Sequence, residues 1–194
     1  NGVYTKVTLS NSDVTYVSGN TILTGAGTAS TKFGNLTVNK GATLTIDKDF
    51  ATVGATVIND GGAITSASTA KQLTLTNTKG EATLNASPVI NTATKSTITN
   101  GGTLTINTNI DAVNVDLTNN ADAKAIVNRA TVVFATNDGL VEVKHSAANV
   151  TVTAGSGEVD NTIGGKITNT ASQTIFATFG AMTNADELKK YDAL

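Results

Sequence analysis

A short phrase recurs along the chain at a fixed interval, and this recurrence limits what the chain can fold into. Four segments carry it: "GATLT" (41–45), "GGAIT" (61–65), "EATLN" (81–85) and "GGTLT" (101–105). Their apolar anchors lie 20 residues apart and are Leu44, Ile64, Leu84 and Leu104. A repeat this short cannot bury a hydrophobic face by itself, so neighbouring copies must stack.

Two further sets of positions keep the same 20-residue step. The first set is Val38, Ile58, Thr78 and Ile98. The second set is Phe50, Ala70, Ile90 and Ile110. Past residue 112 the step shortens to 17 residues, in the series Val133, Val150, Ile167 and in the pair Ile126, Val143. We therefore expect stacked coils of roughly 17–20 residues.

Within each unit the residues alternate in polarity. Apolar residues alternate with threonine in Leu36-Thr37-Val38 and Leu73-Thr74-Leu75, which is the period of a strand with one buried face. Glycine and asparagine clusters such as "NDGG" (59–62), "TNGG" (99–102) and "TNDG" (136–139) mark the turns. Threonine and valine favour strands, and the low charged fraction of 14% leaves few helix-forming residues.

These patterns predict an all-β fold, a right-handed parallel β-helix in which equivalent residues of successive coils lie about 4.8 Å apart. We expect a single domain over 1–194: irregular first coils or a cap over 1–32, regular coils over 33–180, and a short terminal helix over 181–194. The chain starts at Asn1 without a visible signal peptide, so we expect a processed form or an excised piece. A β-sandwich competes with this architecture but does not require columns at a fixed step.

Carboxylates are the strongest candidates for catalysis. Asp47 and Asp49 share one face of a strand, and Asp60 follows in the next turn. Glycosidases use two carboxyl groups about 5 to 9 Å apart. Sugar sites also carry aromatic or arginine side chains, whereas this chain is 4% aromatic and has Arg129 as its one arginine. We therefore favour solvated acids and expect no enzyme activity.

A calcium site is predicted at Asp160. The segment "GSGEVDNTIGG" (155–165) resembles the nonapeptide repeat that binds calcium between β-helical coils. Gly157, Asp160 and Ile163 follow the order of that repeat, with both intervals one residue longer. We expect no other cofactor, because folding of such a stack requires none.

The remaining signals mainly exclude classes of function. There is no cysteine, hence no disulfide or thiolate metal site, and the one histidine, His145, is too few for a histidine zinc site. Its polar neighbours predict a surface position. Scattered lysines argue against nucleic-acid binding, and no stretch approaches the roughly 20 apolar residues of a membrane helix. Glycosylation sequons begin at Asn35, Asn85 and Asn149.

The "GGTLTI" and "GATLTI" phrases, in a chain rich in Thr, Asn, Gly and Val, resemble the stacked regions of bacterial surface proteins of the autotransporter-passenger, S-layer and adhesin types. The resemblance covers roughly residues 33–180. It implies an exported, non-enzymatic structural or adhesive module at the cell surface, partnered by itself or by other surface components. Two alternatives are a carbohydrate-binding or polysaccharide-cleaving β-helix, and a pilin-like or Ig-like adhesion domain.

Overall fold

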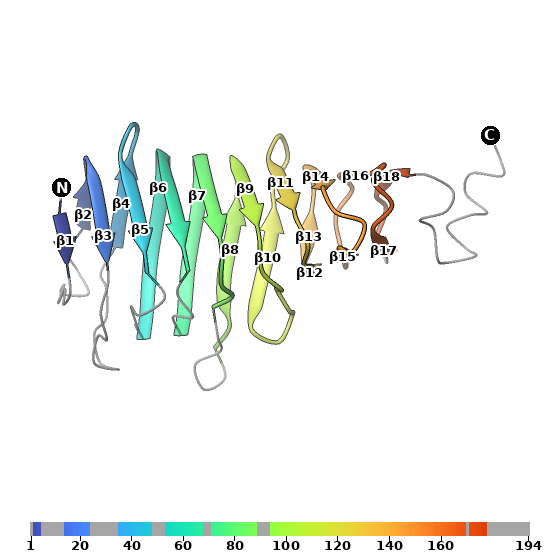
Figure 1. Cartoon of the computed structure of the whole chain (residues 1–194), viewed down its shortest axis with the longest axis horizontal. Coiled ribbons are helices and arrows are strands. Elements are labelled where there is room, and N and C mark those ends of the chain that lie inside the picture. Colours follow the sequence, from blue (N-terminus) through green and yellow to red (C-terminus); the bar gives the residue numbers. More distant parts are fainter. Residues whose placement is uncertain are drawn as a thin grey trace.

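The strands stack into one long solenoid (Figure 1). The computed structural model describes residues 2–4, 14–23, 35–47, 53–67, 71–88, 94–169 and 171–177. About seven turns of about 19 residues each follow one another along the long axis, and their strands pair in parallel. No helix occurs among the described residues. The predicted parallel β-helix is therefore confirmed, while the predicted terminal helix (181–194) lies outside the described residues.

One side of the solenoid, here called wall A, runs along nearly its whole length. It contains the last residues of two long strands, β6 (Val53–Ser66) and β7 (Lys71–Leu84). Its other strands are β1 (Gly2–Tyr4), β3 (Asn20–Leu23), β5 (Thr43–Ile46), β9 (Thr103–Ile106), β11 (Lys124–Val127), β14 (Leu140–Val143), β16 (Glu158–Asn161) and β18 (Thr174–Ala177).

A second side, wall B, joins wall A through β6 and β7, each of which continues around the corner between the walls. The first residues of these two strands belong to wall B. Its other strands are β2 (Val14–Val17), β4 (Asn35–Asn39), β8 (Ser96–Asn100), β10 (Val115–Asn119) and β13 (Thr136–Asn137). Wall C forms a separate sheet from β12 (Thr131–Phe134), β15 (Asn149–Val152) and β17 (Lys166–Asn169).

The described strands of the N-terminal segment belong to the stack. β1 pairs with β3, β3 pairs with β5, and β2 pairs with β4, all in parallel. Of the two expectations for residues 1–32, first coils or a cap, the described strands of this segment form first coils.

Wall A shows how the repeat produces the core. The inward column that contains Leu44 and Ile64 continues to Ala82 and then to Leu104. Leu84, predicted to be its third member, instead lies in the neighbouring column, where it pairs with Ser66 and Ile106. Both columns are buried. The predicted column was therefore wrong by two residues at this one coil. The prediction that Leu44 and Leu104 lie three coils apart on the same wall is confirmed.

The other fixed-step columns were wrong by one residue at several points. Val38 pairs with Asn59 rather than Ile58, and Val150 pairs with Val132 rather than Val133. Similarly, Val143 pairs with Val127 rather than Ile126. A slip of one residue moves a side chain to the other face of a sheet, which explains why Ile58, Ile126 and Val133 are only half-buried. Of the set expected to include Phe50, Ala70 and Ile90, only Ile110 lies among the described residues, and it is buried.

A ladder of buried asparagines occupies the corner between walls B and A. Each of Asn59, Asn77, Asn100 and Asn119 donates from Nδ2 to Oδ1 of the next asparagine, the last being Asn137, at 2.8 Å. All five are buried, with at most 1% of the side chain exposed. The steps between them are 18, 23, 19 and 18 residues. Coil length therefore varies, and this variation produced the errors in the fixed-step columns.

Backbone groups satisfy the remaining hydrogen-bonding capacity of the ladder. Nδ2 of Asn100 also donates to the carbonyl oxygens of Gly102 and Lys124, at 3.1 and 2.9 Å. Its Oδ1 accepts the amide of Gly102 at 3.2 Å. Because a buried amide costs free energy unless it is hydrogen-bonded, these contacts explain how a row of polar side chains can lie inside the solenoid.

Glycines pack against the ladder. A Cβ atom on Gly102 would lie 2.6 Å from the carbonyl oxygen of Gly80 and 3.0 Å from Nδ2 of Asn77. A Cβ atom on Gly157 would likewise lie 2.9 Å from Nδ2 of Asn137. The "TNGG" and "TNDG" clusters end wall B strands at the corner, as predicted, whereas "NDGG" lies inside β6, which continues around the corner with register shifts. In all three clusters the asparagine is buried.

Candidate interaction surface

The outer surface of wall B carries two ranks of side chains in which threonine predominates. The first rank runs from β6 to β10 and contains Thr56, Thr74, Thr97 and Asp116. The second runs from β4 to β13 and contains Thr37, Ile58, Thr76, Thr99, Thr118 and Thr136. These two ranks are called the threonine face below.

The threonine face is a regular grid. Neighbours within a rank lie about 4.8 Å apart because they belong to paired strands, and the ranks are about 6.6 Å apart because they are separated by two residues of one strand. Threonine is branched at Cβ, which restricts its χ1 angle. The backbone beneath it is held by hydrogen bonds to strands on both sides. The face thus presents hydroxyl and methyl groups at nearly fixed positions.

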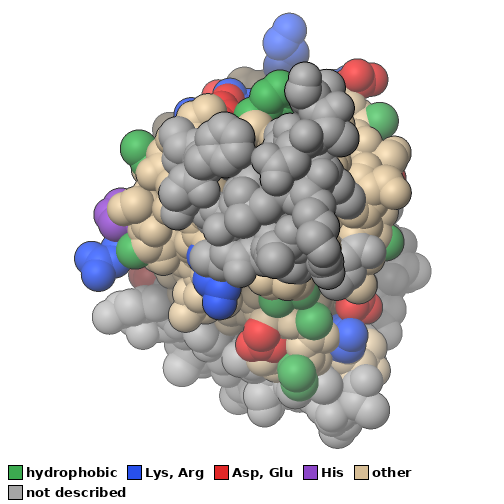
Figure 2. Space-filling model, turned by 90° about the vertical axis from the view of Figure 1, so that its right-hand side faces the viewer, with side chains coloured by type: hydrophobic (Ala, Val, Ile, Leu, Met, Phe, Trp, Pro, Cys, Tyr) green, Lys and Arg blue, Asp and Glu red, His purple; other side chains and the backbone are tan. Residues whose placement is uncertain are grey.

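Charge separates this face from wall A. The outward positions of wall A include Glu81, Lys124, Glu142, Glu158 and Asp160. The two ranks of the threonine face contain a single charged residue, Asp116, whose carboxylate lies 3.0 Å from Nζ of Lys95. In the end-on view of Figure 2 the charged side chains lie scattered around the outline. The threonine face is therefore the less charged of the two walls.

Glu142 is the centre of the charged group on wall A. Its carboxylate contacts Nζ of Lys124 at 2.7 Å and Nζ of Lys144 at 2.9 Å. The hydrogen bond from Lys124, with a smaller contribution from Lys144, lowers the pKa of Glu142 although partial burial acts in the opposite direction. These contacts fix the side chain of Glu142 as an ionised surface group.

Asp111 has a comparable local role in a turn. Its carboxylate accepts hydrogen bonds from the side chain and backbone of Asn114 and from the backbone amide of Val113, at 2.9 to 3.1 Å. These bonds, chiefly the one from the Asn114 side chain, lower the pKa of Asp111. The group stabilises the turn before β10.

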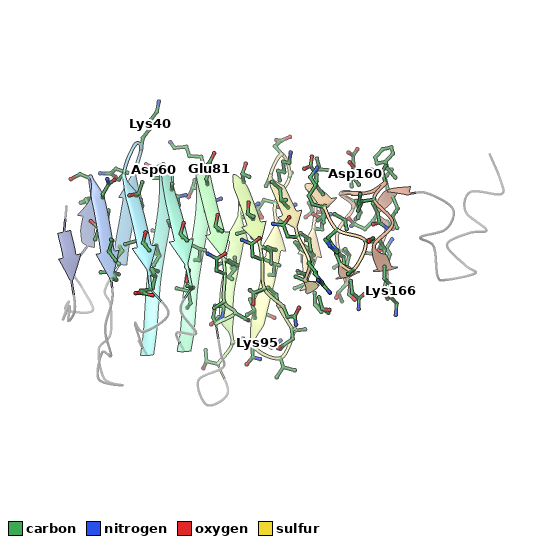
Figure 3. The ribbon with its side chains drawn as sticks, viewed as in Figure 1. Lys40, Asp60, Glu81, Lys95, Asp160 and Lys166 are labelled. Carbon is green, nitrogen blue, oxygen red and sulfur yellow. The ribbon has the colours of Figure 1, made fainter. Side chains whose placement is uncertain are left out.

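The predicted carboxylate pair is not assembled among the described residues. Asp47 follows the last residue of β5, whereas Asp60 lies at the corner that precedes the wall A part of β6. Asp60 forms an ion pair with Lys79 at 2.9 Å, and Figure 3 shows it at the same edge as Lys40 and Glu81. Asp49 lies outside the described residues. The two described acids thus occupy opposite ends of the wall A strands.

Asp160, the predicted calcium ligand, lies in β16 on wall A (Figure 3). Its Oδ1 accepts hydrogen bonds from the backbone amide of Thr162 at 3.1 Å and from the hydroxyl of Thr162 at 2.9 Å. Gly157 is buried against Asn137, and Ile163 is exposed. Within the described ranges no three His, Cys, Asp or Glu side chains gather as metal ligands. Calcium binding at Asp160 stays a prediction.

His145 lies in an exposed turn between β14 and β15, as expected from its polar neighbours. Its Nδ1 accepts the backbone amide of Ala147 at 2.9 Å, and its carbonyl oxygen accepts that of Ala148 at 2.9 Å. Its observed contacts therefore stabilise this turn.

A shallow groove of about 340 Å³ follows the corner between walls B and A near the N-terminal coils. Glycines 41, 61, 62 and 80 form most of its lining, with Ala42, Thr43, Ala63 and Glu81. A Cβ atom on Gly62 would lie 2.7 Å from the carbonyl oxygen of Asn39. The groove is thus a by-product of the close packing of backbone at this corner.

Sequence reasoning expected flat threonine and asparagine faces but did not identify which wall carries the nearly uncharged one. It also missed the asparagine ladder, because the ladder's steps of 18, 23, 19 and 18 residues do not follow a fixed interval. The signal that would have found it is an asparagine at the end of each wall B strand, followed within a few residues by glycine at Asn59, Asn77, Asn100 and Asn137 and by Asp122, with a φ of 62°, at Asn119.

No helix among the described residues is long and apolar enough to cross a membrane. Comparisons of the chain with protein-family models, with curated proteins and with solved structures found no match.

Proposed function

We propose that this chain is a non-enzymatic structural or adhesive module of an exported cell-surface protein, in a surface layer, a fibre or an adhesin. The observation that carries the proposal is the threonine face, a rigid and nearly uncharged grid that repeats with the coils. A solenoid is stabilised by contacts between neighbouring coils, so it forms a stiff rod whose sides are available for contacts with other molecules.

The partners that follow from this proposal are other copies of the chain or other components of the cell surface. Few charges on a face mean little repulsion between copies and little cost for removing water from charged groups. The resemblance to surface proteins in the "GGTLTI" phrases supports the same proposal, including a location outside the cell or on the cell surface.

The proposal is tested by measuring assembly and activity together. Light scattering of the purified chain should rise with protein concentration, both with and without millimolar calcium. A panel of polysaccharides incubated with the chain should release no new reducing ends. A strict monomer in both conditions that cleaves a polysaccharide would favour the alternative function, and Asp47→Asn and Asp49→Asn would then be the first variants to make.

A further inference from the structure

We infer that the threonine face is the contact surface for a second copy of this chain, laid side by side with its own threonine face inward. This inference rests on the proposed function, since it names the partner and the surface for the expected association. Three observations carry it: the repeat distance of the face, its charge and its size.

The repeat distance favours a second copy over an unrelated protein. Side chains in each rank recur with the strand spacing of about 4.8 Å. Only a partner surface with the same spacing can fit methyl and hydroxyl groups between those ranks along its whole length, as side chains interdigitate between paired sheets. The same face of another copy has this spacing because it is built from the same strands. A two-fold axis along the strand direction brings the two faces together and allows the ranks to be offset by half a step.

The charge distribution selects wall B over wall A for this contact. Glu142 and Lys124 lie on wall A with Lys144 just after β14, and burying them against a copy would remove these charged groups from water at a cost in free energy. The central positions of the threonine face, Thr76 and Thr99, are neutral and occupy paired positions on β7 and β8. Their wall A counterparts in the same coils are Thr83 and Thr105, on β7 and β9.

The size of the face determines how strong the contact is. The ten positions of the two ranks, each occupying about 4.8 Å by 6.6 Å, give a patch of roughly 300 Å² per copy. A stable pair of proteins usually buries about 800 Å² on each partner. A single contact is therefore weak, and the association becomes extensive only where many copies are held at high local concentration, as in a surface array.

Two matched double variants test the surface. Thr76→Lys with Thr99→Lys adds two positive charges to the threonine face, and Thr83→Lys with Thr105→Lys adds the same charges to wall A. Both pairs are outward threonines on paired strands, so circular dichroism melts should show both variants folded. We expect the first variant to need at least about tenfold more protein than wild type for the same scattering increase. The second should behave like wild type.

Crosslinking gives a second, independent readout of a weak contact. The chain has no cysteine, so Thr99→Cys and Thr105→Cys each introduce one thiol into the same coil, on wall B and wall A respectively. With a short bis-maleimide, Thr99→Cys should form covalent dimers at least about tenfold faster than Thr105→Cys.

The outcomes separate this inference from the proposed function. If wild type associates but both lysine variants associate equally well, or both lose association equally, the threonine face is not the contact and the proposed function still stands. Equal crosslinking of the two cysteine variants would overturn the inference in the same way. If wild type stays monomeric at every concentration and neither thiol crosslinks, self-association itself is wrong. Binding of wild type to an insoluble polysaccharide, lost only in the threonine-face variant, would assign the face to a different partner.

Discussion

Asn100 occupies the middle of the buried ladder and illustrates how strongly one polar side chain can affect the free energy of unfolding. Replacing it with aspartate keeps the shape but turns a donor of three hydrogen bonds into a group that only accepts. The carboxylate would face the oxygens of Asn119, Gly102 and Lys124. We expect Asn100→Asp to lower the free energy of unfolding by about 3–5 kcal/mol, because it leaves an uncompensated charge inside the solenoid.

The control lies in the same coil. Asn107 also bonds to asparagines of neighbouring coils, accepting from Asn128 and donating to Asn85 at 2.8 Å, but it is exposed. Asn107→Asp should change stability by no more than about 0.5 kcal/mol. Urea unfolding of the two variants makes the comparison. Equal losses would mean that burial of the ladder contributes nothing.

A second residue-scale prediction concerns acid. The contacts from Lys124 and Lys144 hold the pKa of Glu142 below its ordinary value of 4.5. The folded state therefore gains stability from this group above pH 4.5 and loses it as the pH falls through the lower folded value. The lysine side chains are 41% and 50% exposed, so screening limits the contribution to less than about 1 kcal/mol.

Glu142→Gln should remove this part of the acid dependence. Its stability should differ most from wild type near neutral pH, and the two curves should converge as the pH falls through 4.5 and below. Glu158→Gln, on the same wall, removes an exposed carboxylate while leaving the two lysine contacts intact, and it should not reproduce the effect. Urea unfolding from pH 3 to pH 7 measures all three proteins. Parallel wild-type and Glu142→Gln curves would contradict the assignment.

At the scale of the element, the register between paired strands can be tested with engineered disulfides. The wall A parts of β6 and β7 place Thr65 opposite Thr83, whereas a fixed 20-residue step would place it opposite Asn85. Neighbouring parallel strands bring such Cα atoms to about 4.8 Å, and the diagonal position lies about 8 Å away. A disulfide needs Cα atoms no more than about 7 Å apart.

We therefore expect Thr65→Cys with Thr83→Cys to form an intramolecular disulfide under mild oxidation. Thr65→Cys with Asn85→Cys should remain reduced under the same conditions. Thiol titration and mass spectrometry distinguish the two results. Oxidation of the second pair in preference to the first would contradict the observed register and support a fixed step of 20 residues.

The same strands show what could be predicted from sequence. Alternation of leucine with threonine identifies strands because its period is local, and stacking follows because no coil can bury its own face. The prediction that Leu44 and Leu104 share a column was correct because the coil before Ala82 is shorter than the fixed step and the coil after it is longer by the same amount. The position of Leu84 could not be predicted, since the length of each corner sets it. The alternation within a strand also does not tell whether an asparagine at its end turns inward.

The sequence predicts that the candidate surface is flat and polar, but it does not predict which wall carries that surface. A chain with 14% charged residues and many threonines must present flat polar faces if it forms a β-helix. Which wall is nearly uncharged depends on how the strands pair. Glu142 and Thr118 each stand on an outward face, and only the pairing places them on different walls. The carboxylate and calcium predictions depended on spacing along the chain. That spacing gives a distance between side chains only when the lengths of the corners between strands are known.

At the scale of the whole molecule, the coils should behave as interchangeable units. Deleting residues 104–124 joins Thr103 to Ala125, which keeps the inward column of wall A and brings Asn137 next to Asn100. We expect this variant to fold cooperatively and to lose stability in proportion to one coil of about seven. Circular dichroism and urea unfolding provide the measurement.

A shorter deletion serves as its control. Removing residues 104–113 takes away fewer residues but joins Thr103 to Asn114, which ends wall A at that coil and displaces β10. This variant should lose far more stability than the longer deletion. If the deletion of a whole coil is the more damaging, the coils are not equivalent units.

The asparagine ladder also gives the rod an electrical direction. Each amide donates toward the C-terminal coils, and its orientation is fixed because Nδ2 donates to carbonyl oxygens that can only accept. An amide carries a dipole of about 3.5 D, and aligned hydrogen-bonded amides polarise one another. The strands around them contribute little, since the dipoles of a sheet largely cancel. The molecule is thus slightly positive at the end of the ladder near Gln173 and slightly negative near Asn59. Two rods lying side by side gain when they point in opposite directions, and rods meeting end to end gain when they point the same way.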